Sequence, residues 1–141
     1  MKDAKQEIKK IFSGDELSYA GIGSNKDIYI PVAEENFAKK ISSMYDGGFD
    51  LVSLFCAESF AKFRGFTLFY AFEKKGVEEI IVVQRALKSN KATSIAETFP
   101  SAYQYEREIA DGFGVEFVNA FDKRRLFLHE RYPGDFHPLL K

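Results

Sequence analysis

The chain contains 141 residues, of which 45% are hydrophobic, and this size and composition predict one domain with its own core. Its formal net charge of −1 gives no general reason to expect nucleic acid or an anionic membrane as a partner. The single cysteine, Cys56, excludes an internal disulfide and a self-contained iron–sulfur cluster, which normally takes four thiolates. No apolar run approaches the ~20 residues that cross a bilayer, and the charged N-terminus lacks a signal-peptide core. We therefore expect a cytoplasmic protein without direct membrane insertion, whose membrane association, if any, is made through partner subunits.

The first part of the chain predicts one helix followed by two strands. Apolar residues recur at helical spacing through residues 3–12, and Gly14 is expected to end this helix. Residues 18–22 and 27–31 read as a pair of strands around a turn rich in glycine and asparagine.

The middle of the chain predicts a helix and three strands. Residues 34–46 have an amphipathic helical pattern that ends at a glycine pair. Residues 51–56 form a short apolar strand. Residues 66–72 and 79–87 are rich in β-forming side chains and are separated by a segment containing Gly76, which predicts a hairpin.

Two further helices are expected before the sequence becomes irregular. Ser94 is placed to cap a short helix over 95–99, with Glu97 completing a capping box, and Pro100 breaks it. The next helix is expected over 101–113, with Gly114 as its left-handed stop.

The remainder predicts a short strand within 115–128 and an extended segment rich in proline over 131–141. We therefore expect one domain over 1–130 and a C-terminal docking tail over 131–141. Because helices and strands are interspersed and some strands are adjacent in sequence, the predicted class is α+β. The expected architecture has two layers, a mixed sheet of about five strands with helices packed on one side.

Glu106 does not follow the polar and apolar division of its helix. At about 100° per residue, Ala102 and Ile109 lie on the apolar side, and Glu106 projects into that side. A carboxylate there needs a cation or several donors, because an unpaired buried charge costs several kcal/mol. Arg124 and Arg125 are the predicted partners, forming an internal ion cluster with Glu106.

The last third of the sequence resembles a known family. The residues that carry the resemblance are Glu106, Arg107, Glu108, Asp111, Phe113, Gly114, Val115, Phe117, Asp122, Arg124, Arg125, Leu126, His137, Pro138 and Leu139. Their combined spacing is similar to that of the thirty-kilodalton subunit family of respiratory NADH dehydrogenase, which also occurs in energy-converting hydrogenases. The resemblance implies the two-layer fold and a non-catalytic subunit of a membrane-associated oxidoreductase complex, docked on the large subunit of its peripheral electron-transfer arm. That large subunit is the catalytic or quinone-site-forming one.

The contact residues expected from this resemblance are the polar flank of the helix and the tail. They are Arg107, Glu108, Asp111, His137, Pro138 and Leu139. No catalytic residue, cofactor site or metal site is predicted. The sequence does not distinguish between an NADH dehydrogenase and a hydrogenase complex.

Alternative interpretations exist for several clusters. The acids over 106–111 are candidates for a small-molecule enzyme, but Glu106 and Glu108 point about 160° apart on a helix. Lys123, together with Arg124 and Arg125, would suit a nucleic-acid-binding module, although three cations in a near-neutral chain favour ion pairing with the acidic helix. The C-terminal acids and histidines match no zinc signature. Cys56, within an apolar run, is expected to be an inert core thiol.

Overall fold

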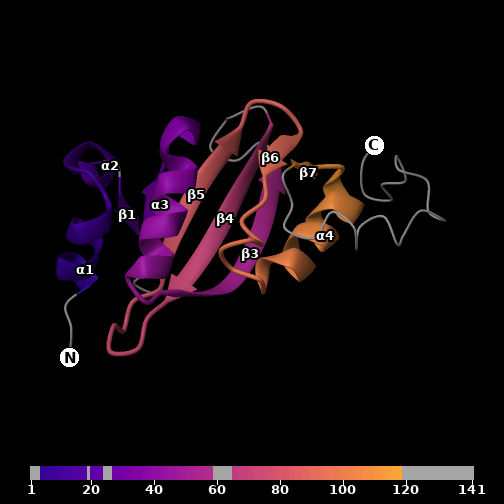
Figure 1. Ribbon diagram of the computed structural model, residues 1–141. Coiled ribbons are helices and arrows are strands. Elements are labelled where there is room, and N and C mark those ends of the chain that lie inside the picture. The colour runs from indigo at the N-terminus through magenta and orange to yellow at the C-terminus, as the bar shows by residue number, and fades with distance from the viewer. Residues whose placement is uncertain (1–3, 19, 24–26, 59–64, 119–141) are drawn as a thin grey trace.

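The computed structural model describes residues 4–18, 20–23, 27–58 and 65–118. In chain order, the elements are α1 (Ala4–Ile11), α2 (Gly14–Ser18), β1 (Gly21–Ile22), β2 (Ile28–Pro31), α3 (Glu34–Asp46), β3 (Asp50–Glu58), β4 (Phe66–Glu73), β5 (Ile81–Leu87), β6 (Lys91–Thr93), α4 (Ala102–Phe113) and β7 (Glu116–Val118). Figure 1 labels these elements along the ribbon.

Five strands form one mixed sheet in the order β1-β2-β5-β4-β3. The expected hairpin is confirmed, since β4 pairs antiparallel with β5, and β3 pairs antiparallel with the other edge of β4. Strand β2 lies parallel to β5, which makes the sheet mixed. A second, two-stranded parallel sheet joins β6 to β7 and was not expected from the sequence.

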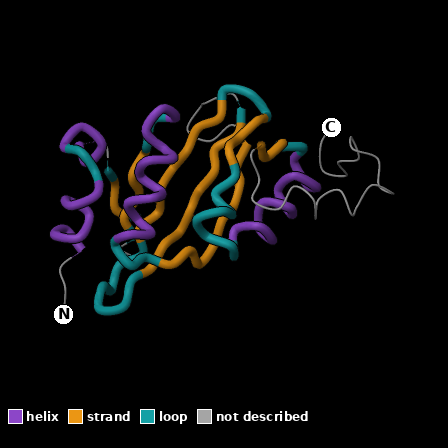
Figure 2. Tube along the Cα trace, in the orientation of Figure 1, coloured by secondary structure: helices purple, strands orange, loops and turns teal. Residues whose placement is uncertain are grey.

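The helices cover one face of this sheet. The larger core cluster contains the inward residues of the strands, such as Leu68, Tyr70 and Phe72, together with Ile8 of α1, Phe37 of α3 and Ile109 of α4. A smaller cluster on the opposite face is built from strand residues and their flanks, and it has no helical member among the described residues. Figure 2 shows α3 in front of the strands, with α1 and α2 to its left and α4 to its right. The predicted two-layer α+β class is therefore confirmed.

Helix α3 has the bounds that the sequence predicted. Phe37, Ile41 and Met44 recur at helical spacing and are buried against the sheet. The helix ends where two glycines follow it, and Gly48 has a φ of 85°, a conformation that side-chain-bearing residues rarely adopt. The backbone then enters β3 directly, because Phe49 donates to the carbonyl of Met44 at 3.0 Å.

The expectation that Gly14 ends the first helical region was wrong. Gly14 is the first residue of α2, and Ser13 precedes it as a cap. The Ser13 hydroxyl accepts from the Glu16 amide at 3.2 Å, while the Ser13 amide donates to the Glu16 carboxylate at 2.8 Å. This reciprocal pair is a capping box, so residue 18 lies in a helix rather than in the expected strand. Strand β1 begins only at Gly21.

The short helix expected over 95–99 is also absent, since these residues form a single turn. The amides of Thr98 and Phe99 both donate to the Ile95 carbonyl, at 3.0 and 2.8 Å, which closes this one turn. Ser94 does accept from a nearby backbone amide, that of Ala96, at 3.0 Å. Glu97 is exposed and does not complete a capping box.

Residues 119–141 lie outside the described part, and so do the extended tail and most of the strand region expected over 115–128; β7 is the strand observed there. Among the described residues, no helix has the length and apolar character required to cross a membrane.

Candidate interface helix and its buried anchor

Helix α4 confirms the predicted helix before Gly114. Gly114 has a φ of 77° and its amide donates to the Ala110 carbonyl at 3.0 Å, which is the left-handed stop that the sequence indicated. Tyr105 fixes the helix to the sheet edge, because its hydroxyl donates to the carbonyl of Val52 at 2.9 Å. Val52 lies at a register shift in β3, and such a bulge leaves its residue without a ladder partner.

Glu106 points into the protein, as predicted, and is 4% exposed. The Ser94 hydroxyl lies 2.5 Å from one carboxylate oxygen, and the Ile95 amide donates to the other at 2.8 Å. The Glu106 side chain of α4 therefore holds the turn that connects β6 to the helix. The proposed partners Arg124 and Arg125 lie outside the described residues.

Two opposing effects act on the Glu106 carboxyl. Burial raises its pKa, while the donors from Ser94 and Ile95 and the positive charge of Arg85 lower it. Burial dominates, so the pKa of Glu106 is above its ordinary value of 4.5.

Arg85 is the nearby cation and is 1% exposed. Its guanidinium binds both carboxylate oxygens of Glu34, at 2.9 and 2.5 Å. It also donates to the Tyr70 hydroxyl at 3.2 Å and to the Thr93 carbonyl at 2.9 Å, and it lies 4.0 Å from the centre of the Phe37 ring. The guanidinium therefore joins β5 to the start of α3, to β4 and to the end of β6.

The sequence prediction missed this arginine, although a signal was present. Along β5, Ile81, Val83 and Leu87 face the helices, and Arg85 occupies the same alternating face. A charged residue at an inward position of a central strand must be paired. Its partner Glu34 precedes it by 51 residues, so no local pattern identifies the pair.

The opposite flank of α4 carries the predicted contact residues. Glu108 and Asp111 are exposed, and Arg107 is half-buried. Gln104 donates to Glu108 at 3.5 Å along this flank. The remaining predicted contact residues, His137, Pro138 and Leu139, lie outside the described part.

A catalytic role for the acids of α4 requires at least two carboxylates that converge on one point. Glu106 is buried while Glu108 and Asp111 are exposed, so these three do not converge.

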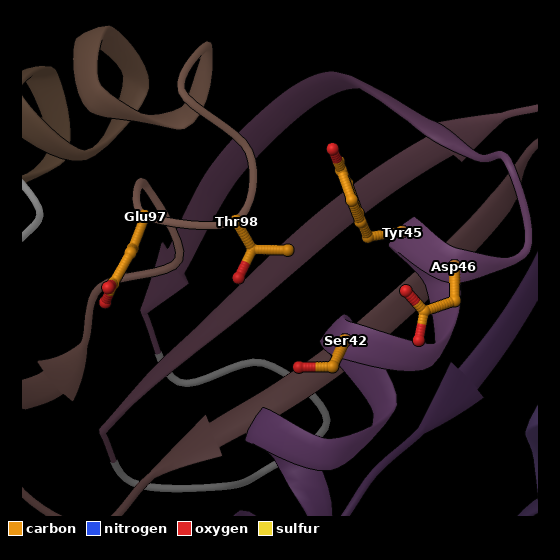
Figure 3. A pocket seen from close by; sticks show the side chains of 5 residues that line it. All are labelled: Ser42, Tyr45, Asp46, Glu97 and Thr98. Atoms are coloured by element: carbon orange, nitrogen blue, oxygen red, sulfur yellow. The ribbon is translucent and has the colours of Figure 1, made fainter.

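A hollow of about 300 Å³ lies elsewhere and is lined by Ser42, Tyr45, Asp46, Glu97 and Thr98. Figure 3 shows Asp46 and Glu97 at opposite ends of it, with Tyr45 and Thr98 between them. It contains no acid of α4.

No cluster of three or more metal-ligating side chains occurs in the described part of the chain. The metal alternative over 129–137 and the basic alternative over 123–125 both lie outside it.

Cys56 is half-buried, and burial raises the pKa of its thiol from 9.0 to about 11. Because the thiolate is the reactive form, we expect alkylation of the folded chain at pH 8 to be about a hundredfold slower than that of the urea-unfolded chain. Timed reaction with iodoacetamide, followed by mass spectrometry, measures both rates. Equal rates would contradict an inert thiol.

The structure is a small α+β domain in which the buried Glu106 and the Tyr105 hydroxyl hold the charged helix α4 in place. The sequence profile of the respiratory-chain NADH dehydrogenase 30 Kd subunit family matches residues 30–141. The chain belongs to this family.

Curated relatives include named parts of hydrogenases and of an NADH dehydrogenase. Hydrogenase-4 component G of Escherichia coli is 37% identical over 79 residues, which cover 54% of this chain and 14% of that protein. The membrane-bound hydrogenase subunit beta of Pyrococcus furiosus is 38% identical over 72 residues, covering 51% and 41%. The NADH dehydrogenase (ubiquinone) iron-sulfur protein 3 of Arabidopsis thaliana is 43% identical over 51 residues, covering 36% and 26%. These matches span less than half the length of each relative.

Two solved structures share the fold. A trypsin-resistant fragment of Nqo5 has a TM-score of 0.65 and 15% identity, with 80% of this chain and 96% of that one covered. A chain of the membrane-bound sulfane sulfur reductase, an archaeal respiratory membrane complex, has a TM-score of 0.68 and 17% identity, with 84% and 72% covered.

Proposed function

We propose that this protein is a non-catalytic subunit of a membrane-associated oxidoreductase complex, either a complex I-like NADH dehydrogenase or an energy-converting hydrogenase. In that role it docks on the large subunit of the peripheral arm. Membership of the family and relatives named as parts of both kinds of enzyme support this role.

The proposed docking surface rests on the division of α4 into a buried inner side and an exposed outer side. Its inner side is held by Glu106 and Tyr105, while its outer side exposes Glu108 and Asp111. A helix anchored in this way presents its outer charges in a fixed arrangement, which lowers the ordering cost of binding. Arg107, Glu108 and Asp111, with the tail residues His137, Pro138 and Leu139, are the proposed contacts.

The test replaces the two exposed acids with their amides. We expect the double variant Glu108→Gln and Asp111→Asn to reduce recovery of the chain in the membrane-bound complex by about fivefold, because charges at an interface contribute to association. The melting temperature of the isolated variant should stay close to that of the wild type, because neither carboxylate is buried. Quantitative immunoblotting of complexes purified from native membranes measures the recovery.

The matched control is the double variant Glu35→Gln and Glu97→Gln, which removes two exposed acids outside α4. It should leave both recovery and melting temperature unchanged. Equal losses in the two double variants would contradict the proposed surface, and recovery of the wild type only as a free monomer would contradict the subunit role.

A further inference from the structure

The sheet face opposite the helices has an apolar centre. Side chains alternate across a strand, so Phe69 and Ala71 of β4 lie on this face together with Phe55 of β3, Val82 of β5 and Tyr29 of β2. No helix contributes to this cluster in the part of the chain that the structure describes.

Three aromatic rings lie across three strands of this face. The Phe55 and Phe69 rings stack with centroids 4.9 Å apart and an interplanar angle of 12°. Tyr29 meets Phe69 edge-on at 6.4 Å. Phe55 remains 44% exposed, although its neighbour Phe69 is almost completely buried. Phe55 is the exposed ring of this group, and aromatic side chains are enriched at protein–protein interfaces.

One end of the same face is acidic. Asp50 and Glu73 are register partners in the antiparallel pair of β3 and β4, so both point to one face, with Cβ atoms ~5 Å apart. The alternation places them on the face of Phe55 and Phe69. Both are exposed, and no ion pair to either carboxylate occurs among the described residues. No lysine or arginine of the described strands alternates onto this face.

We propose that this face, centred on Phe55 and bordered by Asp50 and Glu73, is a second docking surface for a partner polypeptide. The partner surface is apolar at its centre and carries a lysine or arginine that lies between the two carboxylates. Like charges directly opposite each other destabilise an isolated sheet, and a partner cation would neutralise them. The inference rests on one part of the proposed function, that the chain is a subunit of an assembly. The sheet face that it concerns is different from the outer flank of α4.

The first test uses the photo-crosslinking residue p-benzoylphenylalanine at three positions of the full chain, expressed in its native host. Position 55 retains an aromatic ring on the sheet face. Position 104 reports on the outer flank of α4 without removing its charges, and the exposed position 39 on α3 is the control. Illuminated complexes are purified from membranes, and the crosslinked peptides are sequenced.

We expect position 55 to crosslink to a partner peptide that contains apolar residues and a nearby lysine or arginine, and position 39 to give no such product. Crosslinks from position 104 but not from position 55 would overturn this inference and leave the proposed function intact. Crosslinks from position 55 only to residues 119–141 or to a second copy of this chain would also overturn it, as would an equal yield of the same product from position 39. Absence of crosslinks at both 55 and 104 would contradict both proposals.

The second test separates assembly from folding by the direction of two effects. The double variant Asp50→Asn and Glu73→Gln removes a like-charge pair, so the melting temperature of the isolated chain should stay unchanged or rise. Its recovery in the complex should fall by about fivefold, because the partner cation loses its carboxylates. Unchanged recovery would overturn the proposed partner chemistry.

Discussion

Replacing Glu34 with glutamine is expected to lower the free energy of unfolding by about 2–3 kcal/mol, because it leaves the buried guanidinium of Arg85 without its counter-charge. Arg85 would retain the Tyr70 hydroxyl, the Thr93 carbonyl and the Phe37 ring, all of which are neutral. The loss should be at the lower end of the range for buried pairs, since Glu34 itself is 47% exposed and water can enter from its side. Urea denaturation followed by circular dichroism measures the change.

Glu35→Gln is the matched control, because Glu35 is exposed in the same first turn of α3. It removes the same interaction with the helix dipole, and its effect should stay below about 0.5 kcal/mol. The combination of Glu34→Gln with Arg85→Met should recover part of the lost stability, since no unpaired charge then remains buried. Equal effects of the two single glutamine variants would refute the idea that Arg85 depends on Glu34.

Acid is expected to weaken the ion pair of Glu34 with Arg85 in the wild-type protein. The hydrogen bond from Arg85 lowers the pKa of Glu34 below its ordinary value of 4.5, although burial partly opposes this. The resulting stability is present above pH 4.5 and disappears as the pH falls through the lowered pKa. The difference in stability between the wild type and Glu34→Gln should therefore shrink in acid.

Most of the fold followed from local sequence signals. The bounds of α3 came from apolar spacing and two terminal glycines, and the stop of α4 came from Gly114, which has the expected left-handed backbone. The pairing of β4 with β5 followed from the short segment between them. The inward position of Glu106 followed from helical periodicity alone. These features depend on contacts between residues near in sequence, which is why the pattern contained them.

The features that the sequence did not predict depend on distant or competing contacts. The pattern Ser13-x-x-Glu16 is the signature of the capping box of α2, but a glycine that follows a helical run, as Gly14 does, is also typical of a helix end. Ser94 has the features of a cap for a short helix, yet its hydroxyl donates to the carboxylate of Glu106, which is twelve residues away. The pair of Arg85 with Glu34 joins elements that only the folded sheet brings together.

The apolar run Leu68–Phe72 within β4 is a further case in which the local pattern does not identify what covers the strand. Such a run is typical of a strand covered on both faces. In the part of the chain that the structure describes, the face of Leu68, Tyr70 and Phe72 packs against helices, while Phe69 and Ala71 belong to the opposite cluster. The pattern therefore indicates burial on both sides, and the described elements supply a helical cover for one of them.

Replacing Glu106 with alanine is expected to cost about 3 kcal/mol of unfolding free energy, whereas replacing it with glutamine should cost less than about 1 kcal/mol. Alanine removes both acceptors, so the buried Ile95 amide loses its partner and a cavity forms beneath the turn. Glutamine retains a carbonyl oxygen for the Ile95 amide and has an amide group that donates to the Ser94 oxygen. Thermal and urea denaturation of both variants measure the difference, with Glu108→Ala as the exposed control on the same helix.

The pH dependence provides an independent check on Glu106 and has the opposite sign from that of Glu34. Because burial raises the pKa of Glu106 above 4.5, folding favours its protonated form, and this stabilisation is complete below pH 4.5. It is lost as the pH rises through the raised pKa, so the wild type should lose stability relative to Glu106→Gln over that interval. A large, pH-independent loss in the glutamine variant would indicate instead that a cation, such as the predicted Arg124 or Arg125, pairs with this carboxylate. The two outcomes therefore decide whether Glu106 is held by neutral donors with the distant charge of Arg85, or by a direct ion pair.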